Sequence, residues 1–219
     1  MAIRTKKFSR RSPLAAIVVV LAGLLVSGGS YVAATAAVSN TTKTEVDQAT
    51  IDTGKKLFLA NCASCHGKNA EGTANAPSLI GVGAASVDFQ VATGRMPGQA
   101  SGPQLQVKPV QFKQEDIDAL AAYVASLAPG PEAPTDAYLA QTGDATHGGE
   151  LFRINCAMCH NAVGAGGALT HGKYAPSLRN TSAKHIYEAM VTGPQNMPVF
   201  SNSNLSPEDK TDIITYLQY

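Results

Sequence analysis

The 219-residue chain contains no tryptophan, and aromatic residues make up only 6% of it. Charged residues account for 15%, and no segment of useful length alternates apolar and polar residues as a half-buried strand does. The lack of strands disfavours folds built on sheets, including the βαβ units that accompany thioredoxin-like cysteine pairs. We therefore expect an all-α fold with long loops, whose small apolar cores need further support.

Cysteine is also scarce, and all four cysteines lie in two pentapeptides, CASCH at 62–66 and CAMCH at 156–160. A Cys-x-x-Cys-His run is the attachment site of c-type haem, whose vinyl groups take up the two thiols while the histidine reaches the iron. A zinc site built from the cysteine pairs would leave both histidines unexplained. We predict two covalently bound haems c, held by Cys62, Cys65, Cys156 and Cys159, with His66 and His160 as axial ligands.

The chain after residue 50 is an internal duplication. APSL at 76–79 recurs at 175–178, TGRMP at 93–97 returns as TGPQNMP at 192–198, and the helical pattern of 116–124 is echoed at 212–217. Each copy has a helix, the attachment motif, a proline loop, Met-Pro and a final helix. This order resembles class I cytochromes c, which implies two domains of that fold at 52–128 and 144–219, joined by a proline-rich linker at 129–143.

The sixth iron ligand decides what the haems do. Met96 and Met197 each precede a proline, 30 and 37 residues after the attachment histidine. A thioether ligand raises the reduction potential and occupies the position where an outside molecule would bind. The alternative use of methionine as core filler fits Met190, on an expected helix over 184–191. Met158 lies inside the attachment loop and cannot easily reach the distal face.

Three further histidines could replace Met197 in a bis-histidine site, namely His147, His171 and His185. None has a counterpart in the first copy, so we expect all three on the surface.

The resemblance also implies a role for Pro77 and Pro176, whose carbonyls would accept the second N–H of the axial histidines and orient the rings. A plain turn function is the alternative. The pattern Ser206-Pro207-Glu208-Asp209 predicts a helix start. Without haem we expect the chain not to fold, because the haem completes a core of Leu57, Phe58, Leu79, Ile117, Leu120 and Tyr123.

The first 12 residues carry five basic side chains, which the positive-inside rule places in the cytoplasm. Residues 13–38 are predicted to be a transmembrane anchor or a cleaved signal segment, followed by a tether over 39–51. The domains beyond would lie on the extracytoplasmic side. Without the five basic residues, 12 Lys and Arg face 16 Asp and Glu, a charge of about −4 that disfavours nucleic acid and suits a partner with basic rims.

A narrower resemblance rests on the shared Asn-Cys-Ala-x-Cys-His motifs, the PGPEAP linker at 129–134 and GPQNMPVF at 193–200. The chain resembles the dihaem cytochrome c subunit of the actinobacterial cytochrome bc complex. That family implies the electron-transfer arm of a menaquinol–cytochrome c reductase, a translocase in which this subunit has no catalytic site of its own. Its partners would be cytochrome b, the Rieske iron–sulfur subunit and a haem–copper oxidase at the plasma membrane.

Members of that family continue into a C-terminal transmembrane helix, whereas this sequence stops at Tyr219. We expect either a truncated second domain or anchoring at the N-terminus alone. Two other functions stay open: a free-standing dihaem carrier, and a dihaem peroxidase, which the two Met-Pro motifs disfavour. The long loop Gly98–Lys113 is expected to meet a partner.

Overall fold

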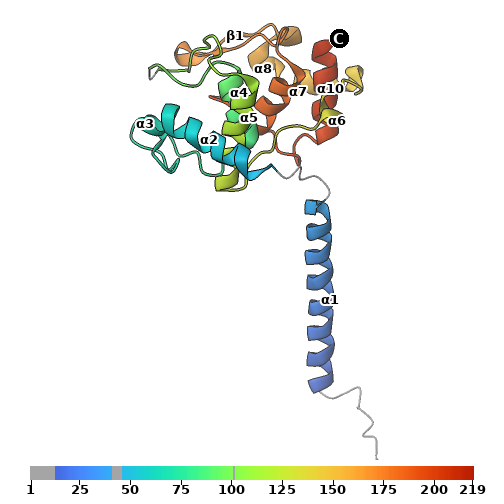
Figure 1. The fold of residues 1–219 in the computed structure, drawn as a ribbon. Coiled ribbons are helices and arrows are strands. Elements are labelled where there is room, and N and C mark those ends of the chain that lie inside the picture. Colours follow the sequence, from blue (N-terminus) through green and yellow to red (C-terminus); the bar gives the residue numbers. More distant parts are fainter. Residues whose placement is uncertain (1–12, 41–45, 101) are drawn as a thin grey trace, which may run out of the picture. The chain divides into compact units, whose positions relative to one another are not determined.

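The computed structural model describes residues 13–40, 46–100 and 102–219 (Figure 1). The chain divides into two compact units, Met1–Val46 and Asp47–Tyr219. The predicted cytoplasmic segment 1–12 and the middle of the predicted tether, residues 41–45, lie outside the described residues.

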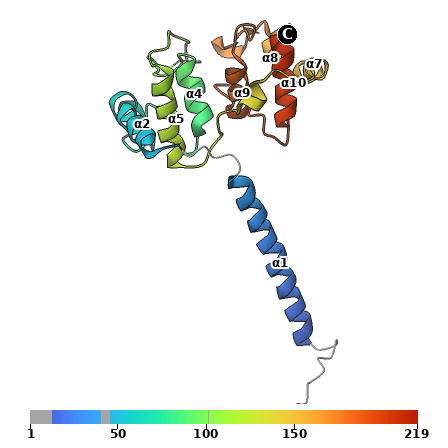
Figure 2. The ribbon, with the colours of Figure 1, turned by 45° about the vertical axis from the view of Figure 1, so that its right-hand side comes forward.

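The first half of the larger unit contains α2 (Gln48–Asn61), α3 (Ala63–His66), α4 (Gly83–Ala92) and α5 (Gln114–Leu127). Helix α5 packs against both α2 and α4, as Figure 2 shows. Four of the six predicted core residues are buried here, and Leu57 and Leu79 are partly buried at the edge of the same cluster; the four are Phe58, Ile117, Leu120 and Tyr123.

The second half repeats this arrangement with α7 (Ala145–Asn155), α8 (Ala157–His160), α9 (Ala183–Thr192) and α10 (Pro207–Gln218). Helix α10 packs against α7 and α9. The predicted helix start is confirmed, because the Ser206 hydroxyl accepts from Asp209 N and the Asp209 carboxylate accepts from Ser206 N. The short helix α6 (Asp136–Leu139) precedes this half, with Tyr138 stacked on Tyr187.

The described residues are mostly helical, as expected for the all-α class, and one short pair of strands was not expected. Strands β1 (Gly167–Ala168) and β2 (Tyr174–Ala175) pair antiparallel in the long loop of the second half. The short 3-10 turn η1 (Ala162–Gly164) precedes β1, and η2 (Thr170–Gly172) connects the two strands. Each strand has only two residues, too few for an alternating pattern to reveal.

Glycines permit the same helix crossing in both halves. A Cβ on Gly54 of α2 would lie 1.9 Å from the backbone carbonyl oxygen of Ala119 in α5. A Cβ on Gly148 of α7 would lie 1.9 Å from the backbone carbonyl oxygen of Asp212 in α10. Neither position has room for any side chain. The repeated glycine before each attachment motif therefore lets the first and last helices of each half meet at backbone contact.

The two halves contact each other directly through α4 and α9. Lys184 forms an ion pair with the buried Asp88, and its Nζ lies 4.0 Å from a carboxylate oxygen of Glu188. His185 Nε2 lies 3.8 Å from Asp88 Oδ1. The side chain of His185 is only 22% exposed, so its expected surface position is wrong: it packs edge-on against Phe89 between the halves.

The loop after Met96 also reaches the second half. The Gln104 side-chain amide accepts from Tyr174 N at 2.9 Å and donates to Tyr174 O at 3.0 Å. Leu105 N donates to Gln195 Oε1 at 3.1 Å. This part of the loop expected to meet a partner is therefore occupied by contacts within its own chain.

The proline-rich linker lies against the first half. Ala85 N donates to the Pro131 carbonyl oxygen at 3.1 Å, and Gly130 and Gly83 approach each other so closely that a Cβ on Gly130 would lie 2.5 Å from Gly83 N. The connection is thus held at its start, in keeping with the stiffness that its prolines predict.

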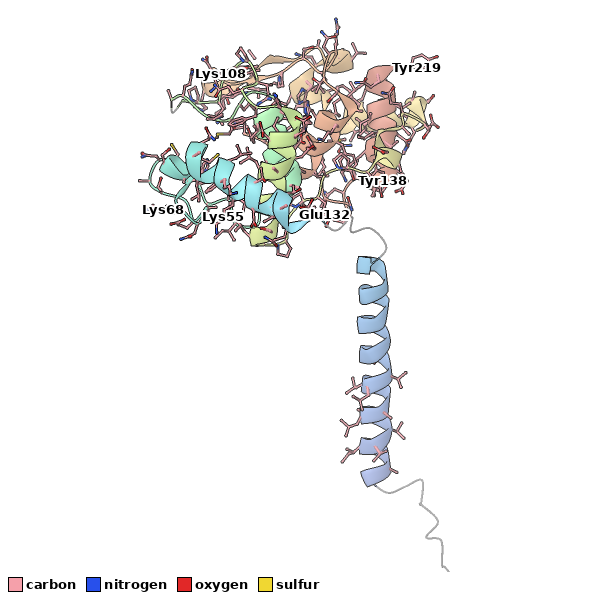
Figure 3. All side chains as sticks on the ribbon, in the orientation of Figure 1. Lys55, Lys68, Lys108, Glu132, Tyr138 and Tyr219 are labelled. Carbon is pink, nitrogen blue, oxygen red and sulfur yellow. The ribbon has the colours of Figure 1, made fainter. Side chains whose placement is uncertain are left out.

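In the described part of the smaller unit lies the helix α1 (Pro13–Asn40), of 28 residues. Its apolar side chains between Ile17 and Val26 are exposed and project from more than one side of the helix (Figure 3). Among the described residues, no helix combines the length and the apolar character needed to cross a membrane.

The interface between the halves predicts a pH dependence of stability. The pKa of Glu188 is raised to about 8, first by burial and then by the Asp88 carboxylate, while Lys184 opposes both effects. From pH about 4.5 to about 8 the folded chain then holds a proton that the unfolded chain releases, so this residue's contribution to stability falls as pH rises. In a Glu188→Gln variant, the free energy of unfolding relative to the wild type should rise across that range and level off above it.

Urea unfolding at a series of pH values measures this difference. Glu150→Gln, which neutralises an exposed carboxylate on α7, is the matched control and should leave the pH profile unchanged. An identical slope for Glu188→Gln and the wild type would contradict the assignment.

Candidate haem-binding sites

Each attachment motif sits at a tight bend between two helices. In the first half, α2 ends at Asn61, and Cys62 N donates to Phe58 O at 2.8 Å before the single turn of α3 begins. The second half repeats this bend, with Cys156 N donating to Phe152 O at 2.9 Å. In both motifs the first cysteine therefore lies near the core, and the histidine ends the short helix that follows.

Both attachment histidines are buried and orient on a proline carbonyl. His66 Nδ1 lies 2.8 Å from Pro77 O, and His160 Nδ1 lies 3.0 Å from Pro176 O. A carbonyl oxygen can only accept, so Nδ1 carries the proton in each ring, and Nε2 keeps the lone pair that binds a metal. Burial lowers the pKa of His160 while the bond to Pro176 opposes that shift, which keeps the ring in the neutral form that ligates iron.

Each of the two methionines that precede a proline packs against the same hydrophobic core as the attachment motif of its half. Met96 follows α4 and packs against the core cluster of the first half, and Met197 packs against that of the second. Met190 is buried on α9, as expected for a methionine that fills the core, and Met158 in the attachment loop is 89% exposed.

The second half contains a cavity of about 570 Å³ around its predicted site. Its lining includes all four predicted residues, Cys156, Cys159, His160 and Met197. Most of the remaining wall is apolar, and it includes Phe152, Leu178, Ile186, Met190, Phe200 and Ile213. A volume in the range of cofactor pockets, two thiols, a nitrogen donor and a sulfur donor together fit a covalently attached haem.

The thiols themselves are unlike those of a redox pair. Burial, followed by the neighbouring Cys159, raises the pKa of Cys156 to about 11, and burial also raises that of Cys62. Thioredoxin-like cysteines need a lowered pKa to supply a reactive thiolate. The raised pKa values of these thiols therefore favour a haem attachment site over a site of thiol–disulfide exchange.

The remaining histidines differ in their surroundings. His147 is half exposed and bonds through Nδ1 to Asp212 at 2.9 Å, and His171 is exposed in η2. His185, in contrast, lines the cavity of the second half.

Sequence reasoning missed several residues of that cavity that come from the first half. They are Phe89, Thr93, Arg95, Gln104 and Val107. A local sequence pattern describes only the repeat in which it occurs. It therefore cannot show that residues of the first repeat line the haem site of the second. One signal was present: Arg95 stands inside the repeated Thr-Gly…Met-Pro motif and has no basic counterpart in the second copy.

The cavity predicts what happens when haem cannot attach. Without haem, the largely apolar walls of this cavity would be left facing water or empty space, which removes the burial that holds the second core together. A chain with Cys156→Ala and Cys159→Ala should therefore lose helix content in its second half. Far-UV circular dichroism measures this, with Met158→Leu, at an exposed position, as control. Native helix content in the double variant would contradict the prediction.

Comparison with known proteins agrees with this geometry. Residues 51–128 match the family model described as cytochrome c, and residues 143–217 match that of cytochrome C oxidase, cbb3-type, subunit III. The cytochrome bc1 complex cytochrome c subunit of Mycobacterium tuberculosis is 45% identical over 98% of this chain and 79% of its own length. The subunit of the same name from Corynebacterium diphtheriae is 38% identical over 99% of this chain and 82% of its own length.

Among solved structures, reduced recombinant cytochrome c4 from Pseudomonas stutzeri is similar over 77% of this chain and 97% of its own, with 21% identity and a TM-score of 0.28.

Two cytochrome c domains, each with its attachment motif, mean that the chain carries two covalently bound c-type haems. It is a c-type electron carrier of a bc complex, and this confirms the family predicted from its motifs. The chain belongs to the family of cytochrome bc1 complex cytochrome c subunits.

Proposed function

We propose that the chain is the two-haem relay through which a quinol-oxidising bc complex delivers electrons to a terminal oxidase. In this assignment Cys62 and Cys65 hold the first haem with His66 and Met96 as axial ligands. The second haem takes Cys156 and Cys159, with His160 and Met197. Pro77 and Pro176 orient the two histidines.

One observation carries the proposal: each half joins a buried histidine, oriented by a proline carbonyl, to a methionine packed beside the same core. When bound there, haem supplies one-electron transfer between ferric and ferrous iron. The protein's part is to present one nitrogen and one sulfur donor, so that no coordination position stays open to oxygen or peroxide. Such sites relay electrons rather than activate substrates, which argues against the peroxidase alternative.

The contacts between the halves support the relay. The Asp88–Lys184 ion pair and the Gln104–Tyr174 hydrogen bonds tie the first half to the second. Electron tunnelling falls steeply with distance, so a fixed arrangement of the two sites serves transfer between them.

The relay's position in the respiratory chain is part of the proposal. One domain would accept electrons from the Rieske iron–sulfur protein of a menaquinol–cytochrome c reductase beside cytochrome b, and the other would pass them to a haem–copper oxidase. The names of the relatives support membership of the bc complex. The charge of about −4 outside the N-terminal basic segment suits docking to basic rims. Quinol oxidation and proton translocation would occur in the other subunits.

The proposal places the haem domains on the extracytoplasmic side of the plasma membrane. Five basic residues among the first 12, followed by the apolar stretch Leu14–Val26, support export with the N-terminus in the cytoplasm. Residues 13–38 would then act as the export segment.

Copurification tests the proposal. An affinity-tagged chain, extracted from native membranes with mild detergent, should bring down cytochrome b, a Rieske protein and haem–copper oxidase subunits. A Met158→Leu variant, changed only at an exposed side chain, should retain the same partners. Recovery of the chain alone would contradict the proposal in favour of a free-standing carrier. Recovery with cytochrome b and the Rieske protein, but with no oxidase, would contradict the oxidase half.

A further inference from the structure

Arg95 is a buried cation without an anion. It follows α4, is 8% exposed, and its guanidinium carbon lies 4.9 Å from the centre of the Phe89 ring. Within the described part of the chain its guanidinium makes no ion pair or hydrogen bond. Buried charges are normally paired, because removal from water is costly when no partner compensates it. The position therefore calls for an anionic group that the protein itself does not provide.

Arg95 lines the cavity that encloses the attachment motif of the other half. The loop that follows it is fastened there, since the Gln104 amide bonds both backbone polar groups of Tyr174, and Leu105 N bonds Gln195. One wall of the second haem site is thus built from the first domain.

The charges around this cavity are of one sign. Its described lining residues include the cations Arg95 and Lys173 but no aspartate or glutamate. Lys173 is partly exposed and donates to Asn196 Oδ1 at 2.8 Å. Arg95 is therefore the buried, permanently charged group of the lining that has no polar partner. A haem brings two propionate carboxylates, the anions that such a wall would receive.

We propose that Arg95 of the first domain is the counter-ion of a propionate on the haem of the second domain. The inference rests on the second haem site of the proposed function. Its consequence is a direct link between the sites, because Met96, the next residue in the chain, is the proposed ligand of the first haem. Arg95 acts as a positioning residue: it fixes the two domains across the bound group, and its charge favours the reduced state of the second haem.

The test uses the full, haem-loaded chain and three variants. Arg95→Gln removes the charge, Arg95→Lys keeps it, and Arg179→Gln removes a charge from an exposed arginine of the second half. The midpoint potential of each haem is measured by spectroelectrochemical titration. Proton magnetic resonance of the oxidised haems, with cross-relaxation to neighbouring side chains, assigns each potential to its domain.

We expect Arg95→Gln to lower the reduction equilibrium constant of the second haem by about fivefold to tenfold, where tenfold corresponds to about 59 mV for one electron. The first haem should change by less than half of this amount. Arg95→Lys and Arg179→Gln should leave the second haem within about twofold of the wild type. An unchanged second haem, or a larger shift of the first haem than of the second, would overturn the proposal.

A second readout covers the case in which Arg95→Gln does not fold. With haem labelled with carbon-13 at the propionate carboxyls, redox-difference infrared spectra of the wild type and Arg95→Lys should differ in the carboxylate stretching bands. Identical bands would overturn the inference. Haem content and the ligation spectra of the wild type are measured first, so a missing haem or a different ligand set would count against the proposed function and not against Arg95 alone.

Discussion

The hydrogen bond from each attachment histidine to a proline carbonyl is the constraint on which the rest of the arrangement depends. His66 and His160 each end a helix of one turn, which alone does not fix the direction of the ring. The carbonyls of Pro77 and Pro176, 11 and 16 residues further along, hold Nδ1 and leave Nε2 as the metal-binding nitrogen. A site with a correctly oriented histidine therefore requires that the short helix, the proline loop and the methionine segment of each half pack against one another.

The duplication has not produced two independent domains. The second cavity takes part of its wall from the first domain, through Arg95 and Gln104, and the buried carboxyl groups of Asp88 and Glu188 meet the partly exposed Lys184 where α4 and α9 pack. Burying charged groups between domains seldom adds stability, but it restricts the orientations that the domains can adopt. A carrier that passes electrons between two sites of its own gains from such a restriction.

Local patterns were enough to predict what each copy contains. The spacing of the cysteines predicts the attachment sites, the Met-Pro pairs predict the methionines beside the cores, and the Ser206 capping box predicts the start of α10. The β1–β2 pair, the half-buried His185 and the contribution of Arg95 to the second cavity were not predictable in this way. The positions of His185 and Arg95 arise from the packing of one copy on the other, and the strand pairing is too short to leave a pattern. Neither feature can be recognised in the repeated motifs of the sequence.

In the proposed function both irons are closed by one nitrogen and one sulfur ligand, so that the chain can only relay electrons. Low-temperature electron paramagnetic resonance and near-infrared magnetic circular dichroism of the oxidised, purified chain test this most directly. We expect two low-spin haems, each with histidine–methionine ligation and neither altered by added peroxide or cyanide at moderate concentration. A high-spin signal from either haem in the resting state, or a bis-histidine spectrum at the second, would contradict it.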